Sequence, residues 1–133
     1  MKSISINCKK NISDVLSTAT KKRNIIVRAE IIEFLEKNSG GYPVKDVVTF
    51  DGEEYEVRVF LSLDASDLNF YIEKPLSFFL DKTKGKIIPI GIDSGDNYYC
   101  VNNETGRVYY WSASDDQYYC LAESLDVFVK AFE

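Results

Sequence analysis

Short aromatic strands separated by polar turns dominate the last third of this chain. The run from Ile87 to Phe132 reads IIPIGIDSGDNYYCVNNETGRVYYWSASDDQYYCLAESLDVFVKAF. Apolar or alternating segments at residues 87–92, 98–101, 107–111 and 118–121 are separated by Gly-, Asn-, Asp- and Ser-rich links, a pattern typical of strands joined by turns. The pattern predicts an antiparallel meander.

A closing helix follows the meander. Ser124 is suited to be its N-cap, and Asp126 in the first turn suits the positive end of the helix dipole. Five apolar residues recur at the spacing of one helical face, which we expect to pack on the sheet: Leu121, Leu125, Phe128, Val129 and Phe132.

Two helices are predicted near the start of the chain. The first carries an apolar face of Ile12, Val15, Leu16 and Ala19 behind a cap at Asn11 or Ser13, and ends in the basic run of residues 21–23. The second helix carries Val27, Ile31, Phe34 and Leu35. It ends at the turn of residues 38–41, because glycine accepts the left-handed conformation that a helix end needs.

The middle of the chain predicts a hairpin and more helix. Asp51-Gly52 is a preferred type I′ turn between strands at residues 44–50 and 53–63. In the second strand the odd-numbered residues are predicted to face the core and the even-numbered ones, including Phe60 and Ser62, the solvent. Residues 68–80 have helical spacing, but Pro75 predicts a break near Lys74 and a second short helix from Pro75 to about Asp81.

These elements predict an α+β fold, an antiparallel sheet with helices packed on one side. With 133 residues and 45% hydrophobic content, the chain is expected to form a single domain over residues 1–133.

The stretch from Ile87 to Phe132 resembles the SUKH superfamily (Smi/Knr-like). The resemblance is strongest after Ile87 and rests on Ile88-Pro89, Gly95-Asp96, the aromatic strand of residues 98–101, Gly106-Arg107-Val108-Tyr109 and Ser124-Leu125. Upstream, Glu33-Phe34-Leu35 and the turn of residues 38–41 are similar to the family's helix and its Asn-Gly-Gly end.

Three positions depart from the family pattern. Asn102 stands where an acidic residue is usual, and Leu125 stands where the residue after the capping serine is usually Phe. The Leu-Pro pair that normally opens the upstream helix is absent. The family is best known for immunity proteins of bacterial toxin systems, with fungal cell-wall regulators among its relatives. The resemblance therefore implies either a protein that neutralises a toxin or a non-enzymatic regulatory scaffold or peptide-binding module.

Charge and aromatic content suggest the contact surface. The net charge is −5, with nine basic against five acidic residues over residues 1–50 and two against eight over residues 91–133. An acidic surface attracts a basic partner, although it also simply keeps a domain soluble. The residues predicted to bind a cognate toxin, through its basic C-terminal domain, are Asp93, Asp96, Tyr98, Tyr109, Trp111, Asp115 and Asp116. The alternative for each aromatic ring is a place in the core, since large apolar rings are usually mostly buried.

Other chemistry is disfavoured. The chain has no histidine, which removes Ser- or Cys-His triads and the commonest metal ligand. Asp115-Asp116 and Asp93 with Asp96 remain as candidate acid and base pairs, and Asp93, Ser94, Asp96 and Glu104 as candidate calcium ligands, but solvated turns explain both sets better. No cofactor, catalytic residue or metal site is predicted. Nucleic acid is an unfavoured partner because the aromatic strands are the most acidic part.

The cysteines and the N-terminus bear on location. Cys8, Cys100 and Cys120 are odd in number and form no CxxC pair, which favours a reducing compartment. Cys100 and Cys120 are expected to be small buried thiols, with a disulfide between neighbouring strands as the alternative. No stretch has the length of a membrane span or a signal peptide, so no membrane contact and a cytoplasmic location are expected.

Overall fold

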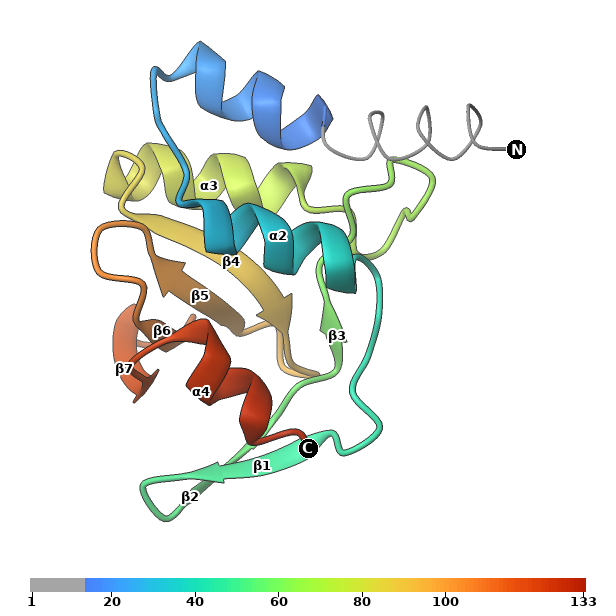
Figure 1. Cartoon of the computed structure of the whole chain (residues 1–133), viewed down its shortest axis with the longest axis vertical. Coiled ribbons are helices and arrows are strands. Elements are labelled where there is room, and N and C mark those ends of the chain that lie inside the picture. Colours follow the sequence, from blue (N-terminus) through green and yellow to red (C-terminus); the bar gives the residue numbers. More distant parts are fainter. Residues whose placement is uncertain (1–13) are drawn as a thin grey trace.

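The computed structural model describes residues 14–133, and the expectations for Cys8, Ile12 and a cap at Asn11 or Ser13 lie outside them. A helical segment at residues 14–22 precedes the elements labelled in Figure 1. The confirmed class is α+β, with a two-stranded and a five-stranded antiparallel sheet. The order is α2 (Ala29–Asn38), β1 (Val47–Phe50), β2 (Glu53–Glu56), β3 (Val59–Phe60), α3 (Glu73–Thr83), β4 (Ile87–Ile92), β5 (Tyr98–Asn102), β6 (Val108–Ser112), β7 (Gln117–Ala122) and α4 (Leu125–Lys130).

The two N-terminal helices follow the predicted apolar faces. Leu16 and Ala19 of the segment at residues 14–22 are buried, as are Ile31, Phe34 and Leu35 of α2. These side chains join the main core because each lies one helical turn from the next. Within residues 14–133, no helix is long and apolar enough to cross a bilayer.

The hairpin turn is confirmed, but the strand after it is not a single strand. Asp51 and Gly52 both have positive φ, 51° and 79°, as a type I′ turn requires. β2 ends at Glu56, and β3 then pairs with β4 in the other sheet. The prediction that Phe60 and Ser62 face solvent is wrong: they are 8% and 3% exposed. The chain crosses between the sheets there, so neither side of it meets water.

The predicted pair of helices over residues 68–81 is a single helix, α3. Pro75 lies in its first turn, where a missing N–H costs nothing, so the expected break marks the helix start. The preceding residues form turns, and Leu68 is 92% exposed. Aspartate side chains there accept backbone N–H bonds, Asp64 from Ser66 at 2.9 Å and Asp67 from Phe70 at 3.0 Å, which favours turns over helix.

The predicted meander is confirmed as strands β4 to β7. Its strand order is β3-β4-β5-β6-β7, so β7 is outermost, and α2 and α4 lie across the front of the sheet in Figure 1. Tyr99 on the front face packs against Phe128 of α4, with ring centroids 6.0 Å apart. Ser124 caps α4 as predicted, accepting the Val127 N–H at 3.2 Å.

The opposite face of the sheet is aromatic. Tyr98 pairs with Trp111 across β5 and β6, and both rings contact Phe79 of α3, at centroid distances of 5.7 and 5.1 Å. Because neighbouring strand residues point to opposite faces, Phe79 and Phe128 lie on different sides of the sheet. Helix α3 thus adds a contact that the expected one-sided packing did not include.

The two described cysteines differ. Cys100 is buried, and burial raises the pKa of its thiol, as expected for an inert core residue. Cys120 is exposed, so its predicted burial is wrong. Both pair with Tyr109, so β6 separates them and no bridge between neighbouring strands forms.

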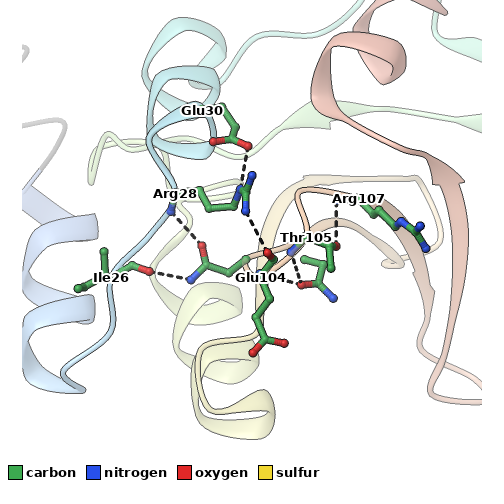
Figure 2. Close-up of polar contacts among 8 residues, drawn as sticks. Ile26, Arg28, Glu30, Glu104, Thr105 and Arg107 are labelled. Carbon is green, nitrogen blue, oxygen red and sulfur yellow. Dashed lines mark hydrogen bonds and ion pairs between the residues drawn. The ribbon is translucent and has the colours of Figure 1, made fainter.

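A polar network ties the β5–β6 turn to the start of α2 (Figure 2). The Asn103 side chain accepts the Arg28 N–H at 2.9 Å and donates to the Ile26 carbonyl at 2.8 Å. It also donates to the Gly85 carbonyl at 3.2 Å. The Arg28 guanidinium donates to the Glu104 carbonyl at 3.0 Å. This one asparagine therefore joins three separate segments of the chain.

Asn102, which stands where the family usually has an acidic residue, stabilises the β5–β6 turn. Its side-chain oxygen accepts the backbone N–H groups of Glu104 and Thr105 at 2.8 and 3.1 Å. A carboxylate could accept the same two bonds, so an amide here preserves the turn.

Candidate functional site

Five carboxylates from three segments meet at one end of the five-stranded sheet, which we call the acidic edge: Glu56, Asp93, Asp96, Asp115 and Asp116. The β4–β5 and β6–β7 turns lie at the same end because the strands are antiparallel. The Ala113 N–H donates to the Asn97 side-chain oxygen at 2.9 Å and joins the two turns. The two predicted acidic turns therefore lie side by side.

Glu56 also belongs to this edge, although no sequence pattern predicted it. Its carboxylate accepts both the backbone N–H and the hydroxyl of Ser94, at 3.0 and 2.6 Å. Glu56 ends β2, so only the path of the hairpin brings it beside the meander. Nothing in the local sequence distinguishes it from the neighbouring glutamates, and no sequence signal could have identified it.

Asp93 holds its own turn together. One carboxylate oxygen accepts the Gly95 and Asn97 backbone N–H groups, both at 2.9 Å, and the other accepts the Tyr110 hydroxyl at 2.6 Å. Burial and this bond raise the pKa of Tyr110. Asp96 is exposed and has a left-handed backbone, with φ 63°. Of these two predicted site residues, Asp96 is the one that presents its carboxylate to solvent.

Asp115 and Asp116 keep their negative charge. The Tyr119 hydroxyl donates to Asp115 at 2.9 Å and lowers the pKa of that carboxyl. The Lys82 ammonium and then the Trp111 indole N–H, at 2.8 and 2.7 Å, lower the pKa of Asp116. Each is exposed, so these bonds set orientation more than stability. A lowered pKa also makes either group a poor general acid near neutral pH.

The three predicted aromatic contacts lie on the face that α3 partly covers. Trp111 is only 8% exposed and belongs to a small core cluster with Phe79, so it offers little contact area. Tyr98 and Tyr109 are half-buried. Tyr119, which the prediction omitted, is 45% exposed on the other face, beside Asp115. Its alternation with Tyr118 was the signal that could have identified it.

The candidate calcium cluster does not assemble. Glu104 lies in the β5–β6 turn, at the opposite end of the sheet from Asp93 and Asp96. Over residues 14–133, no group of three or more Cys, Asp or Glu side chains is arranged to hold a metal ion.

A second surface feature lies beside α2 and α4. An open pocket of about 360 Å³ is lined by Phe34, Tyr42, Val44, Phe60 and Phe132, among others. Tyr42 is 77% exposed, and Val44 is fully exposed. Apolar side chains grouped around a groove offer a place for an apolar segment of another protein.

Removing one hydroxyl from the aromatic face should stabilise the fold. The Tyr118 hydroxyl is buried and has no hydrogen-bond partner among the described residues. We expect Tyr118→Phe to raise the free energy of unfolding by about 1 kcal/mol, because the desolvated hydroxyl is removed at no loss of a bond. Urea unfolding at pH 7 measures the change. The control is Tyr109→Phe, on the same face, for which a comparable gain would contradict the explanation.

The same tyrosine, Tyr118, should also lower the free energy of unfolding at alkaline pH. Burial raises its pKa from 10.0 to about 12. A raised pKa in the folded state means that the neutral phenol is favoured there. The contribution of this preference to the free energy of unfolding is fully present below pH 10 and is lost as the pH rises toward about 12. Tyr118→Phe should flatten this part of the stability curve, and an unchanged slope would contradict the assignment.

Comparison with known proteins agrees with this fold. A family model described as the SMI1 / KNR4 family (SUKH-1) matches residues 13–131. No curated protein and no solved structure matched the chain. The matched range includes every helix and strand that the structure places from α2 to α4. The chain therefore belongs to the SMI1 / KNR4 family (SUKH-1).

Proposed function

We propose that this protein is a cytoplasmic, non-enzymatic immunity protein that binds and neutralises the basic toxin domain of a cognate bacterial toxin. Family membership supports the immunity role, as the SUKH resemblance implied. The observation that carries the charge argument is the acidic edge itself, where Glu56 joins four aspartates from two turns. Such a concentration of one sign favours a partner of the other sign.

The acidic edge would act in two ways. Its exposed carboxylates would speed the encounter with a basic domain and, against a nuclease, occupy the cleft that binds phosphate. The half-exposed ring of Tyr119, beside Asp115, would then supply apolar contact and slow dissociation. Asp115 and Asp116 have lowered pKa values, so this surface keeps its charge across the pH range of the cell.

Coexpression with the neighbouring gene tests the proposal. A toxin domain encoded beside this gene should arrest growth alone and be tolerated when this protein is present. The purified proteins should form a complex that weakens as NaCl rises from about 0.05 to about 0.5 M, because salt screens exposed charges. A neighbouring toxin domain that is neither bound nor neutralised would contradict the proposal.

The pocket beside α4 favours a second candidate, a regulatory scaffold or peptide-binding module. Exposed Tyr42 and Val44 at its rim would contact an apolar peptide segment. Tyr42→Ser would then abolish partner capture, whereas it should leave toxin binding at the acidic edge unchanged. A gene neighbourhood without any toxin would also favour this candidate.

A further inference from the structure

Strand β7 leaves one side of the five-stranded sheet open. It is the last strand in the sheet order, and among the described residues it pairs only with β6. Figure 1 shows no ribbon beyond its outer side. The Gln117 N–H donates to the Asp115 carboxylate at 3.3 Å, and the remaining backbone N–H and C=O groups on that side are available to bind another extended segment.

The other side of the sheet is closed. Strand β3 has only two residues, and the Phe60 N–H on it donates to the Gly41 carbonyl at 2.8 Å. Just beyond, Ser62 exchanges backbone bonds with the segment of residues 70–72, at 2.7 and 2.8 Å. Strand addition is therefore available at β7 and blocked at β3.

The side chains of β7 offer no protection against pairing. Gln117, Tyr119 and Cys120 are exposed, and the latter two point to opposite faces of the sheet. The strand has no lysine or proline, the residues that usually guard a free edge. Leu121 has no partner in the β6–β7 register, so a bulge there limits the regular edge to residues 117–120.

The charges at the two ends of β7 select the partner. Exposed Asp115 and Asp116 precede the strand and exposed Glu123 follows it. A second copy pairing antiparallel would place these aspartates beside its own Glu123, and like charges repel. A strand with Lys or Arg at both ends would instead place opposite charges together.

We propose that β7 is the docking strand of this protein, and that it takes up an extended segment of a basic partner protein by strand addition. That this partner is the toxin domain rests on the proposed function. The segment pairs with residues 117–120 through the backbone, while its flanking basic side chains lie beside Asp115, Asp116 and Glu123.

Amide hydrogen exchange resolved by NMR tests the docking mode. The probes are a synthetic peptide, KKTVTVTVKK, at concentrations up to about 1 mM, and the neighbouring toxin domain. Alternate amides of an edge strand point outward. Along residues 117–120 we therefore expect alternate amides to gain at least about tenfold protection, while those already bonded to β6 change little. Uniform or absent protection with both probes would overturn the proposal.

Charge variants at Cys120 test the choice of partner. This side chain is exposed on β7, so its replacement leaves the core intact. Cys120→Lys should weaken binding at least about tenfold, because it adds a positive charge near Glu123, where the partner's flanking basic side chains would lie, whereas Cys120→Glu should not weaken it. Cys120→Ser is the neutral control. Equal effects of the Lys and Glu variants would refute a basic partner.

The outcomes separate the two proposals. A toxin domain that binds without protecting β7 would overturn strand docking and leave the immunity function standing. If the peptide protects alternate amides and the toxin domain does not bind, strand docking would stand and the immunity function would be overturned. A dimer of the free protein that protects the same amides would overturn the choice of a basic partner, because the second copy would then occupy the strand.

Discussion

Replacement of Asn103 by alanine should lower the free energy of unfolding by about 3 kcal/mol, because three hydrogen bonds, each contributing about 1 kcal/mol, are lost together. The side chain accepts the Arg28 N–H and donates to the Ile26 carbonyl (Figure 2). It also donates to the Gly85 carbonyl. Urea unfolding followed by circular dichroism at pH 7 measures the change.

An isosteric variant separates the hydrogen bonds from the packing. In Asn103→Asp a carboxylate would face the Ile26 and Gly85 carbonyl oxygens, so the charged form should be disfavoured in the fold. This raises the pKa of the new carboxyl in the folded state, so the destabilisation should shrink as the pH falls toward about 4, the ordinary pKa of aspartate in the unfolded chain. The alanine variant should show no such recovery. A loss below about 1 kcal/mol in both variants would contradict the role of Asn103 as a tie between segments.

Neutralising the exposed part of the acidic edge should slow toxin association about tenfold at low salt, since steering depends on the summed charge of a surface. The variant is Asp96→Asn, Asp115→Asn and Asp116→Asn together. Asp93 is kept because it accepts the backbone N–H groups of its own turn. Asp96 and Asp116 have φ of 63° and 53°, a conformation that asparagine tolerates, so the turns should persist.

A charge-matched control makes this result specific. The set Asp14→Asn, Glu33→Gln and Glu73→Gln removes three exposed negative charges from helices away from the acidic edge. Stopped-flow association at about 0.05 M NaCl should distinguish the two sets, and the difference should vanish at high salt. Dissociation should change less than about threefold, because exposed charges act mainly on encounter. Equal association rates for both sets would contradict steering by the acidic edge.

Local sequence rules predicted much of the architecture. Alternating aromatics separated by turn residues predicted the meander, and Asp51-Gly52 predicted the type I′ turn. They failed where tertiary contacts changed the outcome. Phe60 follows the alternation of an exposed position, yet it is buried because Phe34 packs edge-on against it, at 5.2 Å between ring centroids.

The candidate site, too, was predicted only in part from the sequence. The sequence predicted Asp93, Asp96, Asp115 and Asp116 from turn chemistry and charge, and antiparallel pairing alone was enough to bring the two turns to one end. It could not predict that Asp93 would be used inside its turn or that Glu56 would join the edge. Those outcomes depend on how the hairpin packs against the meander.

The sequence by itself determined the meander, the hairpin turn and the apolar faces of most helices, because side-chain periodicity and turn chemistry act over a few residues. It also determined the sign of the charge at one end of the chain. Only the tertiary structure decided which of these side chains reach solvent. Trp111 and Tyr119 lie on neighbouring aromatic strands, but α3 packs on the face that carries Trp111, whereas Tyr119 lies on the other face and is 45% exposed, since burial depends on the neighbour that packs from elsewhere in the chain.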